Sequence, residues 1–109
     1  MADALKILGQ SKPAGNTLTD LYTVPGATSA VASTLAVCNQ SGLAARYRVS
    51  VAAAGAADAA SPYIVYDAIL AANETRTFTI GASLATTDVV RVYSDGGTVS
   101  FTLFGAEIT

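Results

Sequence analysis

Apolar and polar residues alternate along most of this chain, which is the pattern of β-strands buried on one face. The clearest case is the segment 45–52, where Tyr47, Val49 and Val51 alternate with arginine and serine. Because successive side chains of a strand point to opposite faces, these three residues share one face. The segment is therefore predicted to be an antiparallel strand with one face in the core.

Seven further segments have strand composition, and turn residues recur roughly every ten positions between them. The eight predicted segments are 5–10, 17–24, 28–39, 45–52, 63–70, 74–80, 88–94 and 98–104. The set predicts an all-β, antiparallel two-sheet sandwich of seven or eight strands, immunoglobulin-like or jelly-roll. An eight-stranded closed barrel is the alternative.

The alternation also predicts which side chains face the core. In the segment 28–39, one face carries Val31, Ser33, Leu35 and Val37, and the other carries smaller residues. Inward positions in the later segments are Phe78, Ile80, Val90, Val92, Val99, Phe101 and Leu103.

Short glycine-containing segments predict how the strands connect. The turn 39–42 and the turn Asp95-Gly96-Gly97 are each predicted to close a hairpin between neighbouring strands. Pro25-Gly26 predicts a type II turn. Residues 71–73 are also expected to turn the chain.

Three other segments are predicted to be irregular. The alanine-rich segment 53–61 is expected to be a loop with at most one helical turn, because Gly55 and its short length weaken a helix. The segment 81–87 is expected to be a loop whose Leu84 lies under the sheet, and Gly105 is expected to kink the last strand.

The length of 109 residues fits a single domain. Residues 1–16 are predicted to be a first strand or an arm that orders on a neighbouring subunit. Residues 17–109 are predicted to form the sandwich.

The composition favours a protein that is covered by other chains. Hydrophobic residues make up 51% of the sequence and charged residues 13%, below the usual quarter. The mean hydropathy is +0.45, so a monomer would have a sparsely charged surface. We therefore expect a homo-oligomer, with part of this surface buried between subunits.

The charges and the apolar runs exclude several partners. The net charge is −2 and the six basic residues are scattered, so we expect no contact with nucleic acid. No apolar run has the length of a membrane span or a signal peptide. Synthesis in a cytoplasm is therefore expected.

The sequence offers little for catalysis. It has no histidine, and Cys38 lies in an apolar run where it is expected to be buried. Asp67 and Glu74 flank a turn and are expected to be a solvated pair rather than a catalytic one. We therefore predict no enzyme activity, no metal, no cofactor and no small-molecule substrate.

Aromatic side chains are the remaining candidates for binding. Tyr63 and Tyr66 are three residues apart, so on a regular strand they face opposite sides, with one in the core and one outside. The outer tyrosine could stack on a sugar or anchor a subunit contact. A sugar-binding module for host attachment is therefore one hypothesis of function.

From Leu21 onward the sequence resembles small virion proteins of tailed bacteriophages and cyanophages. The resemblance is carried by five stretches, LYTVP at 21–25, VCN at 37–39, YRVSV at 47–51, DVVRVYS at 88–94 and VSFTLFGAEI at 99–108. It implies a capsid decoration (cement) protein with no catalytic residues, or alternatively a tail, baseplate or adaptor subunit.

A decoration protein of this type implies a location in the virion, reached from the host cytoplasm. Its implied partners are the major capsid protein or other virion structural proteins, and copies of itself, with a trimer favoured.

Overall fold

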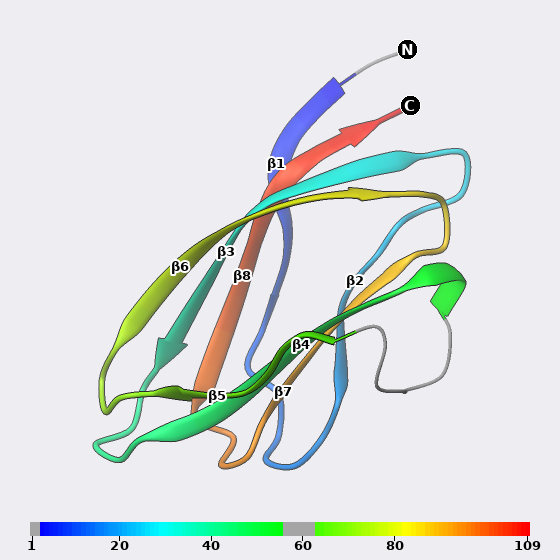
Figure 1. Cartoon of the computed structure of the whole chain (residues 1–109). Coiled ribbons are helices and arrows are strands. Elements are labelled where there is room, and N and C mark those ends of the chain that lie inside the picture. The colour runs from blue at the N-terminus through cyan, green and yellow to red at the C-terminus, as the bar shows by residue number, and fades with distance from the viewer. Residues whose placement is uncertain (1–2, 56–62) are drawn as a thin grey trace.

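The computed structural model describes residues 3–55 and 63–109. They form eight strands and one short 3₁₀ helix, as Figure 1 shows. The elements are β1 (Asp3–Ser11), β2 (Thr19–Thr23), β3 (Ser29–Asn39), β4 (Ala45–Ala52), η1 (Ala53–Gly55), β5 (Tyr63–Leu70), β6 (Thr75–Leu84), β7 (Val89–Ser94) and β8 (Val99–Ile108).

The strands form two four-stranded antiparallel sheets. Sheet A has the order β1-β8-β3-β6 and sheet B has the order β2-β7-β4-β5. The pairing is nested, since β1 pairs with β8, β2 with β7, β3 with β6 and β4 with β5. This is the winding of a jelly roll, so the predicted all-β sandwich is confirmed.

Both predicted hairpins are wrong. The turn after β3 leads from sheet A to β4 in sheet B, and the turn after β7 leads from sheet B to β8 in sheet A. Of the two turn glycines, Gly97 has a positive φ of 70° and Gly96 does not. Turn residues mark where the chain reverses, but pairing between distant strands decides which sheet receives the next strand.

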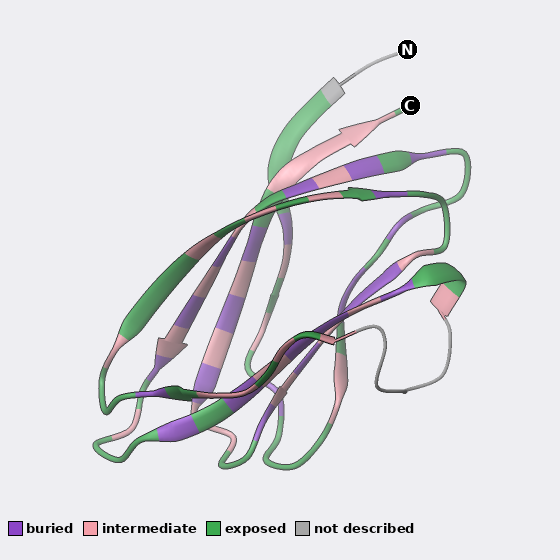
Figure 2. Cartoon of the chain, in the orientation of Figure 1, coloured by how far each residue is buried: buried purple, intermediate pink, exposed green. Residues whose placement is uncertain are grey.

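The core lies between the two sheets, as the buried positions of Figure 2 show. Tyr47 and Phe101 are its largest fully buried side chains, and their ring centroids are 6.2 Å apart. The predicted inward positions of β7 and β8 are confirmed, because all five are buried. They are Val90, Val92, Val99, Phe101 and Leu103.

Sheet A contains a line of β-bulges that crosses several strands. The register shifts between Ile7 and Gly9 in β1, and between Ala32 and Thr34 in β3. β6 has an extra residue at the same level, where Gly81 has a positive φ of 63°. Bulges increase twist, and in Figure 1 the strands of sheet A cross in projection, with β1 and β8 separating from β3 and β6 beyond the crossing.

The bulge in β3 changes which residues face inward. Beyond it, Leu35 and Val37 are buried as predicted. Before it, Ala30 and Ala32 are buried, while Val31 is half-buried and Ser33 is exposed. The prediction that Val31 and Ser33 face the core is therefore wrong, because one extra residue reverses the alternation.

The other predicted irregular segments have mixed outcomes. The turn near Pro25 places the positive φ at Ala27 (55°) rather than at Gly26, so it is not the predicted type II turn. β6 continues through Gly81 to Leu84, so no loop begins at 81, although Leu84 is buried as predicted. Of the segment 53–61, residues 53–55 form η1 and the rest lies outside the described residues.

The sandwich is closed along one side, where β1 lies against β2. A Cβ atom at Gly9 would lie 2.2 Å from the Leu21 carbonyl oxygen, so only glycine permits this approach. The Tyr22 hydroxyl donates a 2.6 Å hydrogen bond to Glu107, whose carboxylate also accepts from Lys6 at 2.9 Å. Burial and this carboxylate raise the pKa of Tyr22. The two hydrogen bonds lower the pKa of Glu107.

Candidate functional site

The acidic side chains singled out in the sequence lie beside arginines. No group of three or more His, Cys, Asp and Glu side chains in residues 3–55 and 63–109 could hold a metal ion. Asp67 pairs with Arg48, and Glu74 pairs with Arg76, so the two acids do not form a pair with each other. Cys38 is partly exposed rather than buried as predicted, because it lies on the outer side of β3.

The outer face of sheet B carries most of the tyrosine and arginine side chains. Three of the five tyrosines and three of the four arginines of the chain lie there. We call this surface the tyrosine–arginine face; it comprises Arg46, Arg48, Tyr63, Tyr66, Asp67, Arg91 and Tyr93. Its strands are β7, β4 and β5, which are neighbours in the sheet.

Arg48 is at the centre of this face. Its Cζ atom lies 4.2 Å from the ring centroid of Tyr66 and 4.4 Å from that of Tyr93. Its Nε and Nη2 atoms donate to the two carboxylate oxygens of Asp67 at 2.6 and 3.2 Å. Hydrogen bonding to Asp67 raises the pKa of Arg48, and the same contact lowers the pKa of Asp67. The guanidinium is therefore fixed in one orientation.

Tyr63 and Tyr66 lie on the same side of β5, so the prediction of opposite faces is wrong. Their ring centroids are 5.1 Å apart in an edge-to-face arrangement. The cause is irregular pairing of β5, whose register against β4 shifts twice, on either side of Val49. Asp67 has a positive φ of 52° beside this shift, and Tyr66 is 61% exposed.

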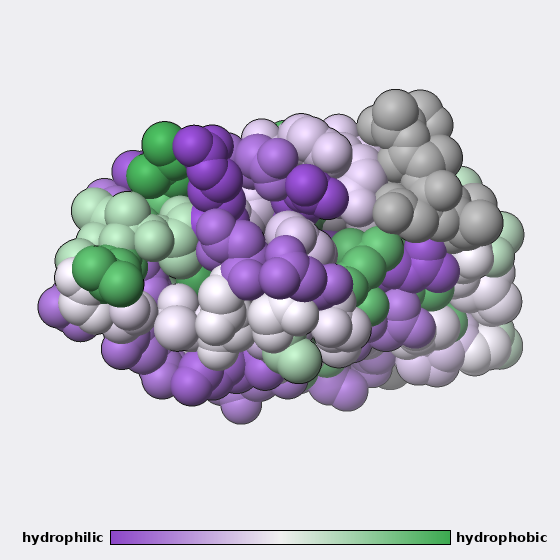
Figure 3. Space-filling view, turned by 90° about the horizontal axis from the view of Figure 1, so that it is seen from below, coloured by the Kyte–Doolittle hydropathy of each residue, from purple (hydrophilic) through white to green (hydrophobic). Residues whose placement is uncertain are grey.

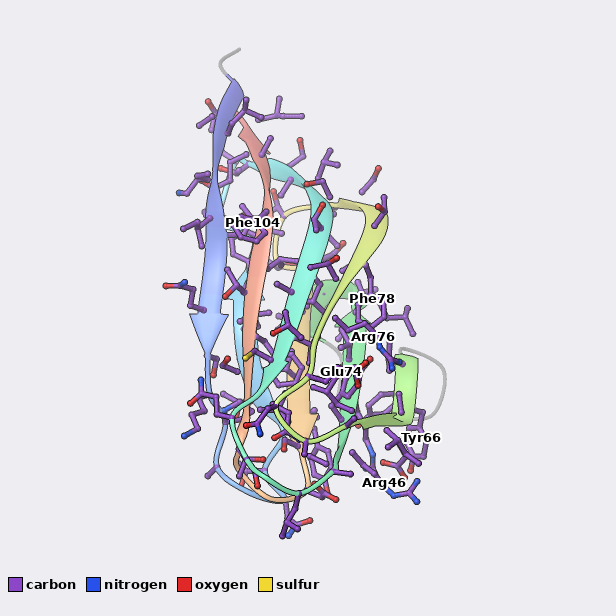
Figure 4. The ribbon with its side chains drawn as sticks, turned by 90° about the vertical axis from the view of Figure 1, so that its left-hand side faces the viewer. Arg46, Tyr66, Glu74, Arg76, Phe78 and Phe104 are labelled. Atoms are coloured by element: carbon purple, nitrogen blue, oxygen red, sulfur yellow. The ribbon has the colours of Figure 1, made fainter. Side chains whose placement is uncertain are left out.

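A second candidate site is an apolar cleft on the open side of the sandwich. β5 and β6 leave the turn at residues 71–74 and separate, as Figure 1 shows. The cleft between the sheets has a volume of about 410 Å³. Its lining is Leu35, Val51, Ile64, Val65, Phe78, Thr79, Ile80 and Ala82. Figure 4 shows Phe78 and Arg76 projecting from β6 toward β5.

A third candidate is an apolar surface on the outer face of sheet A, near the termini. Leu5 is 88% exposed, Ile7 51% and Phe104 39%. Ile7 pairs with Phe104 across β1 and β8, and Ala106 lies opposite both Leu5 and Val31. We call these five residues the terminal apolar patch. In Figure 4, Phe104 lies on the opposite side of the sandwich from Tyr66 and Arg46.

The far end of the molecule has no comparable apolar band among the described residues. Leu43 is 76% exposed in the turn between β3 and β4. Figure 3 views this end, where hydrophobic residues appear as separate small patches among hydrophilic ones. Scattered exposed hydrophobic residues of this kind are normal on a protein surface.

Sequence reasoning found part of these sites. It selected Tyr63 and Tyr66, but it did not find the stack of Arg48 between two tyrosines, because the partners come from β5 and β7. It also did not find the terminal apolar patch. The exposed alternation Leu5-Lys6-Ile7 was an available signal, but its exposed face depends on pairing with β8.

The strand order of the two sheets defines the chain as a jelly-roll domain. No protein-family model matches the chain, and no curated protein matches its sequence. No helix among the described residues is both long and apolar enough to cross a membrane.

Proposed function

We propose that this protein is a structural component of a tailed-phage virion, and specifically a decoration protein that binds the assembled shell. The resemblance of residues 21–108 to small virion proteins supports the proposal. The fold adds an analogy, because jelly rolls occur in viral capsid domains, although a fold alone does not define a function.

The observation that carries the proposal is the terminal apolar patch. Leu5, Ile7 and Phe104 are exposed, and the partly exposed Val31 and Ala106 lie beside them in the sheet, on a chain with few charges. Contiguous exposed apolar surface of this kind marks contacts with other proteins. The patch therefore supplies a surface for the shell, and repeated copies on a shell add avidity.

Shells that lack the protein provide the test. Purified wild-type protein and the variant Leu5→Glu/Ile7→Glu are added to such shells, and bound protein is measured by cosedimentation. The wild type is expected to saturate the shells and to raise their melting temperature. The variant is expected to bind at least tenfold more weakly, because binding would bury two charges.

The control is Leu43→Glu, which adds one carboxylate at an exposed leucine in the turn between β3 and β4. It is expected to bind like the wild type. Absence of wild-type binding, or an unchanged melting temperature of the shells, would contradict the proposal. Gold labelling of intact virions distinguishes the tail or baseplate alternative, for which the label is confined to the tail.

A further inference from the structure

The tyrosine–arginine face lies on the opposite side of the sandwich from the terminal apolar patch (Figure 4). A protein that binds the shell through the outer face of sheet A leaves the outer face of sheet B exposed. The exposed groups of sheet B then determine which ligand it binds.

The face presents donors and acceptors that are fixed in position. Arg48 uses Nε and Nη2 for Asp67, which leaves its remaining N–H groups for a ligand. Each Asp67 oxygen accepts one of these bonds and retains acceptor capacity. The side chains of Arg48 and Asp67 are 24% and 35% exposed. A ligand with adjacent hydroxyl groups, which both donate and accept, matches such a pair.

The charges balance only when residues at the edge of this face are counted. The face itself carries Arg46, Arg48, Arg91 and Asp67, and Asp20 and Asp95 lie beside it. Asp67 and Asp20 accept hydrogen bonds from Arg48 and Arg91, and Asp95 accepts one from the backbone N–H of Arg46. A surface without net charge does not select an anionic ligand. A neutral ligand is therefore favoured.

The tyrosines add the apolar part of the site. Tyr66 is the most exposed of them, and it contacts Tyr63 on one strand and Arg48 on the next. The negative face of an aromatic ring attracts the C–H groups of a sugar ring. Tyr93 is fixed by its hydroxyl, which donates to Asn16 Oδ1 at 2.7 Å. The platform is preorganised, which lowers the entropy lost on binding.

We propose that the tyrosine–arginine face is a binding site for neutral glycans, with Tyr66 as the stacking residue and the Arg48–Asp67 pair as the hydrogen-bonding group. This function goes beyond shell binding and does not depend on it. Tyrosine and arginine are also enriched in protein interfaces, so a protein is the competing occupant of this face, and the test distinguishes it from a glycan.

The test uses the isolated full-length protein and a panel of neutral oligosaccharides built from glucose, galactose, mannose or their N-acetyl derivatives. Binding is measured by NMR chemical-shift perturbation with millimolar sugar. At least one oligosaccharide is expected to shift the resonances of Arg48, Tyr66 and Asp67. Tyr66→Ala and Arg48→Lys are each expected to weaken binding at least tenfold.

Phe104→Ala is the matched control, since it removes an exposed aromatic ring from the other sheet, and its affinity is expected to equal that of the wild type. Circular dichroism and melting curves establish that each variant is folded. The proposal is overturned if no oligosaccharide binds, or if only sulfated or carboxylated sugars bind in a salt-dependent manner. It is also overturned if Tyr66→Ala abolishes shell binding while no sugar binds, since the face is then a protein contact.

Discussion

At the scale of single residues, glycines mark where sheet A is packed most tightly. A Cβ atom at Gly105 would lie 2.0 Å from the Val31 carbonyl oxygen and 2.9 Å from Leu8 Cδ1. The first contact is with backbone, which cannot move aside without disturbing the pairing of β3 and β8. Gly105 was expected to kink the strand; β8 continues through it to Ile108, and the register between β8 and β3 shifts between Phe104 and Gly105.

Gly105→Ala is expected to reduce the free energy of unfolding by about 1–3 kcal/mol, the usual cost of overpacking. Urea denaturation measures the loss. The control is Gly42→Ala, where an added Cβ meets nothing within 4 Å, and its effect is expected to stay within about 0.5 kcal/mol. Equal effects of the two substitutions would show that β3 and β8 are not in such close contact.

Asp88 is a second residue whose hydrogen bonds are expected to stabilise the fold. Its two carboxylate oxygens accept hydrogen bonds from the backbone N–H groups of Ala54 and Ala85, both at 2.9 Å. These bonds lower the pKa of Asp88 below its ordinary value. A carboxyl whose pKa is lowered by folding stabilises the protein above its unfolded pKa, and this stability is lost as the pH falls through the folded value.

The Asp88→Asn variant is expected to melt at a lower temperature than the wild type at pH 7, because the amide oxygen replaces only one of the two acceptors. The difference is expected to shrink as the pH falls below about 4, because the unfolded wild type then binds a proton at Asp88 and the stabilisation by the carboxylate is progressively lost. Melting curves at pH 7 and at pH 3 measure it. A difference of the same size at both pH values would contradict this role.

At the scale of elements, β-bulges decide which residues form the core. In β3 the extra residue at Ser33 exchanges the inner and outer faces, so Val37 is fully buried while Val31 lies in the terminal apolar patch. In β5 the shifted register brings Tyr63 and Tyr66 together. A register shift in β3 therefore changes which residues form the core, and a separate register shift in β5 forms a candidate binding face.

Val37→Ala is expected to cost about 2 kcal/mol, from lost burial and the cavity that remains. Val31→Ala is expected to cost less than about half of that, because Val31 does not face the core. Both values come from urea denaturation of the same protein. Equal losses would mean that β3 alternates without a bulge, as the sequence alone predicted.

The period-two pattern predicted the strands, since each of the eight predicted segments overlaps one strand, but it did not predict which sheet the chain enters after a turn. It did not predict the bulges, because an extra residue leaves the composition of a strand unchanged. Interior glycines such as Gly81 and Gly105 were the available signal. The tyrosine–arginine face forms because β7, β4 and β5 are neighbours in sheet B. This order depends on pairing between segments that are distant in the sequence, so the local pattern of residues does not predict it.

At the scale of the whole molecule, the jelly roll separates three surfaces. The terminal apolar patch lies outside sheet A, the tyrosine–arginine face lies outside sheet B, and the apolar cleft opens between β5 and β6. Since the first two surfaces lie on opposite sides of the molecule, both can be occupied at the same time. This arrangement fits a protein fixed to a shell through sheet A that presents sheet B outward.

Hydrogen–deuterium exchange of the protein, free and bound to its shell, tests most directly whether sheet A near the termini is the buried side. β1 is an edge strand that carries Leu5 and Ile7, so backbone amides in residues 3–11 and 104–108 are expected to exchange more slowly on the shell. Unchanged exchange in these segments, with protection only on β4, β5 and β7, would contradict the account.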